Sequence, residues 1–358
     1  MKLAVLAQTP PPLHGQSVMV RALIDGLSRE SIEIIPIEFR LSRSAADIGS
    51  WRPGKMVAVL EACFQAVAAR LAGADTLYYV PAPGKRGALY RDWLVMLLCR
   101  PFYRRLILHW HATGLDEWLE NQATALERAI TRRLLGNADF AIVLTPQLRS
   151  GAESLRAKKI AVVANGVPDP GVMTREAGND FNVLFVGLCS EQKGLFDAID
   201  AVVAANDSTP TRPFRLVAAG SFPDRATERR FADLAAKHGN QIRHAGFATG
   251  DAKRRLFTNA RCLCLPSRLA HEGQPLVLLE ALAAGLPIVA TNWRGIPDTV
   301  PSQCGRLVAL GNVPALAAAL VDIRAHPPAP GIARAHYLAH FTLEQHLQAL
   351  AEAIESVM

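Results

Sequence analysis

The chain has 358 residues, of which 50% are hydrophobic and 20% charged, and its formal net charge is +7. This length predicts two domains, and the composition is typical of an ordinary α/β protein rather than a disordered or fibrous one. No apolar run is long enough to span a bilayer, and the first one, residues 3–7, is too short for the core of a signal peptide. We therefore interpret residues 3–7 as a β-strand and expect a cytoplasmic protein.

The positive charge is concentrated in the first half of the chain. Residues 1–170 contain 21 Lys or Arg and 15 Asp or Glu, which gives +6, whereas residues 171–358 contain 18 and 17, which gives +1. A basic first half suggests an acidic partner, which is anionic lipid, a phosphate-bearing acceptor or nucleic acid; the alternative is that the charge serves solubility alone. Neither a dense Lys/Arg run nor a recognisable nucleic-acid-binding motif occurs, so we expect no nucleic-acid partner.

The six cysteines are scattered along the chain. No further ligands stand close to them at the spacing of a metal site, which favours buried, reduced thiols.

A strand, a proline-rich turn and a helix open the chain. Ser17 is expected to cap a helix over residues 18–27. The turn lacks the G-x-G-x-x-G pattern of a dinucleotide site, which excludes a conventional NAD-binding domain. Alternating apolar strands and helices follow, including one helix predicted over residues 119–135, and this alternation indicates parallel sheets.

Residues 88–105 combine aromatic and basic side chains in an apolar helix that Pro101 should break. Two interpretations remain open. The stretch contacts a membrane surface or a lipid-linked acceptor, or it is a core helix whose arginines extend past their own stems to solvent.

A predicted strand beginning at Leu106 ends in the polar sequence His109-Trp110-His111. Ligands of open α/β sheets bind at the carboxyl ends of strands. A single histidine at such a place is more often structural, but His111 directly precedes a turn of small residues. His111 is therefore the first candidate for a ligand contact here, and His109 is the second.

A change of composition separates the two halves of the chain. The strand at residues 160–163 leads into Asn165-Gly166, a turn dipeptide, and the polar, Pro- and Gly-containing segment after it is typical of a linker. We predict four parts: a first domain at 1–168, a linker at 169–180, a second domain at 181–340 and a final segment at 341–358.

The most informative stretch is residues 266–291, in which Glu272 and Glu280 stand eight residues apart. Pro275 suits the first turn of a helix over residues 276–284, and Gly285 should end that helix. The N–H groups of Gly273, Gln274 and Leu276 would then lie at a helix N-terminus, which suits phosphate oxygens. The alternative is a surface loop before a buried helix, with Glu280 at a solvated position.

The sequence E-G-x-P-x-x-x-x-E-A, which starts at Glu272, resembles the E-x7-E signature of family 4 retaining glycosyltransferases. The similarity continues to Thr291 and through Gly295-Ile296-Pro297-Asp298, where the family usually has Glu in place of Asp298. Weaker matches extend it over most of the chain. The resemblance implies the GT-B fold, in which two Rossmann-like α/β/α domains face each other across a cleft. It also implies that the C-terminal helix crosses back to the first domain.

The resemblance assigns roles to individual residues. Glu280 is expected to bind the donor ribose, and Glu272, with the amides around Pro275, to hold the sugar and phosphate. Lys193 is expected to offset negative charge on the leaving diphosphate, and His111 to contact the donor sugar. The expected catalytic residues are His111, Lys193 and Glu272. Further donor contacts are expected from Gly187, Gly194, Phe247, Gly273, Gln274, Pro275 and Leu276, and acceptor-side contacts from Gly15, Gln16 and His109.

The chain departs from the family pattern at Leu188, where an arginine usually binds the diphosphate beside the lysine. Arg268 and Arg294 are candidates to replace it. After the first strand, Gln16 stands where a second glycine often follows. Phe247 comes after a glycine whose following backbone holds the nucleotide base in the family, and a core phenylalanine is the equal alternative.

The resemblance implies transfer of a sugar from a UDP- or GDP-sugar to a hydroxyl acceptor. The basic first half favours a lipid-linked or polysaccharide intermediate as this acceptor, at the inner face of the membrane. No Asp-x-Asp pair occurs, so neither a metal nor another cofactor is expected. One alternative is a GT-B-like nucleotide-sugar epimerase or hydrolase, which would release sugar without an acceptor. The other is a basic protein that binds lipid or nucleic acid without catalysis and does not depend on Glu272 or Glu280.

Overall fold

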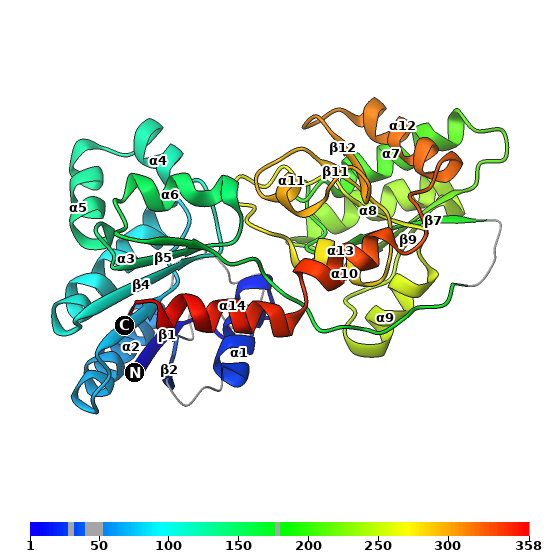
Figure 1. Ribbon diagram of the computed structural model, residues 1–358. Coiled ribbons are helices and arrows are strands. Elements are labelled where there is room, and N and C mark those ends of the chain that lie inside the picture. Colours follow the sequence, from blue (N-terminus) through cyan, green and yellow to red (C-terminus); the bar gives the residue numbers. More distant parts are fainter. Residues whose placement is uncertain (28–31, 40–52, 176–179, 358) are drawn as a thin grey trace. The chain divides into compact units, whose positions relative to one another are not determined.

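The computed structural model describes residues 1–27, 32–39, 53–175 and 180–357. The chain forms two compact units, of which the first comprises Met1–Gly166 with Glu344–Met358 and the second comprises Val167–Leu343. Residues 176–179 of the expected linker lie outside the described residues. Each unit contains a six-stranded parallel sheet with flanking helices (Figure 1), so the predicted α/β class is confirmed.

The first unit has its strands in the order β2-β1-β3-β4-β5-β6. The order of winding reverses between β1 and β3, which places a topological switch point there. The strands are β1 (Lys2–Ala7), β2 (Glu33–Glu38), β3 (Thr76–Tyr79), β4 (Arg105–Trp110), β5 (Phe140–Val143) and β6 (Ile160–Val162).

Helices cover both faces of this sheet. Alternate strand residues such as Leu6 and Leu108 pack in one buried cluster with α2 (Pro53–Leu71) and α3 (Arg86–Cys99). Residues one position away, such as Val5 and Ile107, pack in the opposite cluster with α1 (Gly15–Gly26) and α14 (Leu343–Glu355). The remaining elements of this unit are η2 (Arg100–Phe102), α4 (Leu115–Asn121), α5 (Ala125–Leu135), η3 (Pro146–Leu148) and α6 (Arg149–Ser154).

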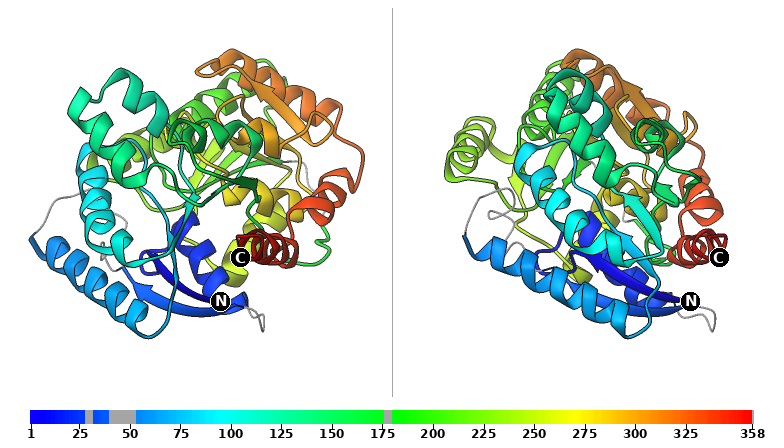
Figure 2. Two further views of the ribbon diagram at one scale, coloured as in Figure 1. Left: turned by 60° about the vertical axis from the view of Figure 1, so that its left-hand side comes forward. Right: turned by 90° about the vertical axis from the view of Figure 1, so that its left-hand side faces the viewer.

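The last helix, α14, completes the core of the first unit. Its buried residues Leu350 and Ile354 belong to the cluster that contains Leu3 of β1. Met1 and Val357 pack against the same cluster, so both ends of the described chain lie on the first unit, as Figure 2 shows. The prediction that the final helix crosses back to the first domain is therefore confirmed.

The second unit has the strand order β12-β11-β10-β7-β8-β9, which reverses between β7 and β10. Its strands are β7 (Phe181–Val186), β8 (Phe214–Ala219), β9 (Ile242–His244), β10 (Cys262–Leu265), β11 (Ile288–Thr291) and β12 (Gly305–Val308). Its helices are α7 (Leu195–Asp207), α8 (Arg225–His238), η4 (Gly239–Gln241), α9 (Gly250–Asn259), α10 (Leu276–Ala283), α11 (Ile296–Thr299), α12 (Val313–Ala325) and α13 (Ile332–His340).

Two predicted helix boundaries are wrong, and side-chain caps explain both. The expected helix over residues 119–135 is divided into α4 and α5, because Thr124 and Glu127 form a reciprocal capping box that starts a new helix. The first helix begins at Gly15 rather than residue 18, because His14 is its N-cap and Ser17 completes that cap from the third helical position.

Candidate functional site

Two loops of the second unit leave the sheet side by side where its strand order reverses. β10 pairs in parallel with β7, so the loops that follow both strands lie at the same edge. The loop after β7 contains Lys193 and leads to α7, and the loop after β10 contains Glu272 and leads to α10. Open α/β sheets bind their ligands outside the carboxyl ends of the strands at such a switch point.

Lys193 and Glu272 join these loops in a close ion pair. The Nζ atom of Lys193 lies 2.8 Å from each carboxylate oxygen of Glu272. The hydroxyl of Ser267 donates a hydrogen bond of 2.5 Å to Oε2 of the same carboxylate. The Glu272 side chain is only 6% exposed. Removal of one partner from a buried pair costs about 3–5 kcal/mol, so a ligand that separates these groups must supply equivalent partners.

The loop that holds Glu272 is itself anchored. The side chain of Thr291 donates to the carbonyl of Ser267 at 2.5 Å, and the indole N–H of Trp293 donates to the carbonyl of Leu269 at 2.9 Å. The backbone N–H of Arg268 donates to the carbonyl of Gln192 at 2.9 Å and so connects the two loops. The carboxylate is therefore held on backbone that has little freedom to move, as preorganised binding requires.

Glycines allow these loops to approach each other closely. At Gly194 a Cβ atom would lie 2.2 Å from the carbonyl oxygen of Pro266, and the φ angle of +81° disfavours any other residue. At Gly220 a Cβ atom would lie 1.7 Å from the carbonyl oxygen of Gly187. The sequence motif Lys193-Gly194 thus combines a cation with the glycine that lets it come close to the Glu272 loop.

The N-terminus of α10 directly follows Glu272. Pro275 is the N-cap of α10, one position before the first turn in which we expected it. Among the described residues, the N–H groups of Gly273 and Leu276 have no hydrogen-bond partner. The Gln274 side chain is buried and donates to the hydroxyl of Thr299 at 3.2 Å. The positive end of the helix dipole and these N–H groups suit an anionic ligand.

Glu280 lies on α10 and pairs with Lys253 of α9 at 2.5 Å. The Glu280 side chain is 26% exposed and that of Lys253 is 30% exposed, so the pair is accessible. Burial raises the pKa of Glu280, and Lys253 opposes this shift. Glu280 is therefore neither a solvated surface group nor fully buried, and Lys253 is a site residue that the sequence did not indicate.

Phe247 lies in the loop between β9 and α9 and is 62% exposed. The alternative of a core phenylalanine is therefore wrong. The residue follows Gly246, whose φ angle of +75° turns the chain sharply at this point.

Leu188 leaves no cation at the position where the resemblance leads one to expect it, and its side chain is 40% exposed. Of the two candidate substitutes, Arg268 pairs with Glu191 at 3.1 Å and approaches Asp197 at 3.7 Å. The guanidinium of Arg294 packs over the ring of Trp293, 4.6 Å from its centroid. The charge of Arg268 is thus already matched by two carboxylates.

The histidine candidates lie in the first unit, at the carboxyl end of β4. The rings of His109 and His111 pack with their centroids 4.1 Å apart. Burial, together with the nearby His346 and His14, lowers the pKa of His111 to about 3. Burial, His111 and His346 hold the pKa of His109 well below its ordinary value. Both histidines are therefore neutral hydrogen-bonding groups near neutral pH.

Gly15 and Gln16 occupy the first positions of α1, also in the first unit. The N-cap of this helix, His14, accepts a hydrogen bond from the Ser17 N–H at 3.3 Å. The expected site residues are therefore divided between the units: the first unit holds Gly15, Gln16, His109 and His111, and the second holds Gly187, Lys193, Gly194, Phe247, Glu272, Gly273, Gln274, Pro275, Leu276 and Glu280.

Comparison with known families identifies the second unit. The family model described as "Glycosyl transferases group 1" matches residues 180–326. These residues form a group 1 glycosyltransferase domain. The match includes Lys193, Glu272 and Glu280 and thus the whole switch-point arrangement.

Relatives and solved structures agree with this assignment. The amylovoran biosynthesis glycosyltransferase AmsK of Erwinia amylovora is 28% identical over 175 residues, which are 47% of this chain and 42% of that protein. The alignments with the curated relatives span about half of their length. Sucrose-phosphate synthase of Thermosynechococcus elongatus has a TM-score of 0.77 at 20% identity and covers 99% of this chain and 98% of its own.

A second solved structure, Anabaena HepE in complex with UDP-glucose, has a TM-score of 0.71 at 17% identity, with 99% of this chain and 100% of that chain covered. At these identities the structural comparison establishes the fold alone. The fold is GT-B, as the sequence predicted.

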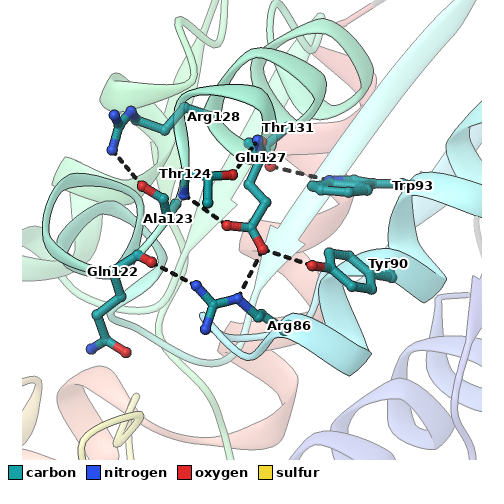
Figure 3. A network of polar contacts seen from close by, with 9 residues as sticks. All are labelled: Arg86, Tyr90, Trp93, Gln122, Ala123, Thr124, Glu127, Arg128 and Thr131. Carbon is teal, nitrogen blue, oxygen red and sulfur yellow. Dashed lines mark hydrogen bonds and ion pairs between the residues drawn. The ribbon is translucent and has the colours of Figure 1, made fainter.

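Outside the glycosyltransferase domain, the aromatic and basic stretch of the first unit is engaged in internal contacts (Figure 3). Oε1 of Glu127 accepts hydrogen bonds from Arg86 at 2.9 Å and from the Tyr90 hydroxyl at 2.7 Å, and Oε2 accepts the Thr124 N–H at 2.7 Å. These donors, Arg86 first, lower the pKa of Glu127 to about 2. The indole of Trp93 donates to Thr131 at 3.1 Å.

Other side chains of residues 88–105 follow the same pattern. Arg91 pairs with the buried Asp92 at 2.7 Å, Arg100 donates to the carbonyl of Leu134 at 2.5 Å, and the Tyr103 hydroxyl donates to the carbonyl of Ala66 at 2.6 Å. These arginines therefore hold the first unit together rather than simply extending to solvent. In the described part of the chain no helix is long and apolar enough to cross a membrane.

Sequence reasoning missed Ser267 and Lys253 in the second unit. Each contacts an expected glutamate through a pairing that becomes visible only once the loops are placed. A signal for Ser267 existed, since it lies within residues 266–291, the most informative stretch of the sequence. No local signal distinguished Lys253 from the other charged residues of α9.

Proposed function

We propose that this protein is a retaining glycosyltransferase that moves a sugar from a nucleotide diphosphate sugar to a hydroxyl acceptor. The observation that carries this proposal is the Lys193–Glu272–Ser267 contact at the switch point of a group 1 glycosyltransferase domain. It brings a cation, a carboxylate and a helix N-terminus together at the edge where α/β sheets bind nucleotides.

In the proposed reaction, the bond between the anomeric carbon and the diphosphate oxygen breaks, and a bond from that carbon to the acceptor oxygen forms. The acceptor proton leaves with the diphosphate. Lys193 stabilises the negative charge that develops on the diphosphate, together with the N–H groups of Gly273 and Leu276. Glu272 then accepts hydrogen bonds from sugar hydroxyls in exchange for its contact with Lys193.

The other proposed donor contacts follow from placing the diphosphate beside Lys193 and the N-terminus of α10. Glu280 would accept hydrogen bonds from the ribose hydroxyls and Phe247 would lie beside the base. The neutral imidazole of His111 would contact the donor sugar from the first unit. Protein groups would supply the positive charge around the diphosphate, with no resident metal or other cofactor.

The donor and acceptor classes are part of the proposal. A neighbour in fold was solved with UDP-glucose, which supports a UDP-sugar, with a GDP-sugar second. AmsK is named for amylovoran biosynthesis, which supports a polysaccharide or lipid-linked intermediate as acceptor. The excess of +6 in residues 1–170 suits a phosphate-bearing acceptor at the inner face of a membrane.

A panel of UDP-, GDP- and ADP-sugars tests the donor. The true donor raises the unfolding temperature, since a ligand at 100 times its Kd stabilises the folded state by about 2.7 kcal/mol. With that donor, NMR of the product made on a hydroxyl acceptor should show the anomeric configuration of the donor. Release of free sugar at the same rate with and without acceptors would favour the hydrolase, and lack of binding by all donors would contradict the proposal.

A further inference from the structure

Two buried histidine nitrogens in the first unit have no hydrogen-bond partner. His109, at the carboxyl end of β4, is 1% exposed, and His346, in the first turn of α14, is 3% exposed. Among the described residues, Nε2 of each ring is buried without a partner. Buried polar groups in proteins are nearly always satisfied by protein or by a bound molecule, so each of these atoms needs an explanation.

The contact that Nδ1 of each ring makes determines whether Nε2 of that ring is a hydrogen-bond donor or an acceptor. The fully buried hydroxyl of Tyr78 contacts Nδ1 of His109, its only partner among the described residues. If the Tyr78 hydroxyl donates to Nδ1, only the His109 Nε2–H lacks a partner. If Nδ1 donates to Tyr78 instead, the hydroxyl proton of Tyr78 lacks an acceptor in addition to the unpaired Nε2. The structure therefore assigns the His109 proton to Nε2, which is a hydrogen-bond donor.

His346 has the opposite character. Its Nδ1 lies 2.6 Å from the carbonyl oxygen of Ala164, which can only accept, so the proton is on Nδ1. Burial lowers the pKa of His346 and keeps its ring neutral. Nε2 of His346 therefore presents a lone pair and is a hydrogen-bond acceptor.

The two rings lie on the same side of the sheet. Ile107 belongs to the buried cluster under α1 and α14, and His109, two residues later on β4, faces the same side. Leu350 of α14 belongs to that cluster, and His346 lies four residues earlier on the same helix face. Ala164 follows β6, which is two strand spacings, or about 10 Å, from β4. His346 acts electrostatically on His109, so the two rings lie near each other within this interval.

We propose that the carboxyl end of β4 contains a buried site for one hydroxyl group, to which His109 donates and from which His346 accepts a hydrogen bond. An O–H group is the smallest ligand that does both. Its source is either a water molecule or a sugar hydroxyl of a substrate. The described residues include no group of His, Cys, Asp or Glu placed to hold a metal ion, so the histidines do not form a metal centre.

Tyr78 is a positioning residue in this arrangement. Its contact sets the tautomer of His109, and the His109 ring packs against that of His111. Through these contacts, the bound hydroxyl group connects α14 with the histidine that we propose for the donor sugar. The inference adds a second polar site to the proposed enzyme and concerns only residues of the first unit.

Nitrogen-15 NMR of the histidine rings in the full chain tests the site, with H109Q and H346Q used to assign the signals. We expect His109 protonated at Nε2 and His346 protonated at Nδ1. In Y78F the His109 signal should change towards the other tautomer. Y79F is the matched control, because Tyr79 is equally buried but donates to Asp92 instead, and it should leave both rings unchanged.

The same spectra distinguish the two sources of the hydroxyl. If neither ring signal responds to a saturating donor sugar or acceptor, the occupant is water; a shift of both identifies a sugar hydroxyl. In the second case H346F should raise the KM of that substrate about tenfold at constant kcat. Protonation of His109 at Nδ1 or of His346 at Nε2 would overturn the proposal. Because the tautomers are measured without substrate, this failure is separate from that of the proposed reaction.

Discussion

The carboxyl ends of the two sheets differ in chemistry although both sheets have six parallel strands. In the second unit this edge is charged, and its charges are matched: Lys193 with Glu272, and Lys253 with Glu280. In the first unit the same edge holds neutral histidines, and Nε2 of His109 and of His346 has no partner within the described part of the chain. The charged side chains of the second unit's edge are therefore already paired with each other, whereas two neutral rings at the first unit's edge can each form one more hydrogen bond.

This difference indicates how each edge would meet a ligand. A diphosphate must displace carboxylates from lysines, so binding at the second unit exchanges one set of charged contacts for another. At the first unit, an uncharged hydroxyl group adds contacts without displacing any. The two edges therefore suit ligand groups of different chemistry, charged groups at the second unit and uncharged polar groups at the first.

The largest expected effect comes from Lys193→Ala. It should lower kcat for sugar transfer by about 10²–10³, the usual effect of removing one group that stabilises developing negative charge. Steady-state kinetics with the identified donor measure it. Lys158→Ala is the matched control, because Lys158 forms an ion pair of similar length with Asp139 in the first unit.

Because Lys193→Ala leaves Glu272 buried without its partner, the double variant K193A/E272Q should restore the unfolding temperature while transfer stays low. Equal loss of activity in the Lys158 control, or full activity of Lys193→Ala, would show that the charged edge of the second unit is not the donor site.

Glu280→Ala should weaken nucleotide binding about 10- to 100-fold, because it removes hydrogen bonds to a charged acceptor worth about 1.5–3 kcal/mol. Titration calorimetry with the free nucleoside diphosphate measures this loss. Glu153→Ala, which removes an exposed carboxylate of α6, should leave the affinity unchanged. An unchanged Kd for Glu280→Ala would remove this residue from the site.

The neutral histidines should make folding pH-dependent. The pKa values of His109, His111 and His346 are lowered in the folded protein, so the unfolded chain takes up protons first as the pH falls below its ordinary histidine pKa of about 6.5. Their contribution is complete above that pH and is lost below it, at about 1.4 kcal/mol per pH unit for each histidine.

Denaturant unfolding between pH 7 and pH 5 measures this loss, and H346Q should flatten the profile. H326Q serves as the control, because His326 is 78% exposed. A profile that H346Q leaves as steep as in the parent would contradict the neutral, buried state of this ring.

The smallest effect is expected at the internal network of the first unit. Glu127→Gln removes charge from the contacts with Arg86, Tyr90 and Thr124, and should lower the unfolding temperature by a few degrees. Donor affinity should not change, since none of these groups is among the proposed donor contacts. Thermal unfolding without the donor measures the stability, and its dependence on donor concentration measures the donor affinity. A changed donor Kd would refute a purely structural role.

The sequence predicted how a loop and a helix are laid out around Glu272 in the second unit, because the residues that define them are local in the chain. The spacing of Glu272, Pro275 and Glu280 fixes a loop and a helix, and strand-end rules bring Lys193 to the same edge. The pairing of Glu280 with Lys253 could not be predicted, since 27 residues separate them and many lysine rotamers compete. The capping box of Thr124, by contrast, is recognisable in the sequence as T-x-x-E, and this pattern predicts that a new helix begins there.

The first unit's site was harder to predict for a topological reason. His346 reaches the end of β6 only because α14 returns across the sheet, and it then contacts a residue 182 positions earlier in the chain. Periodicity identifies a helix but not the sheet on which it packs. His109 was considered because of its position on a strand, whereas nothing in the sequence around His346 distinguished it.

The return of α14 has a consequence for how the chain is made. Val167–Leu343 are an insertion within the first unit, whose apolar face around Leu3 and Ile107 is covered by α1 and is completed by α14 only when Leu350 and Ile354 have been synthesised. At about 5–20 residues per second, the ribosome needs roughly 10–35 s to make the intervening unit. The first unit is thus completed only after the second unit has been synthesised.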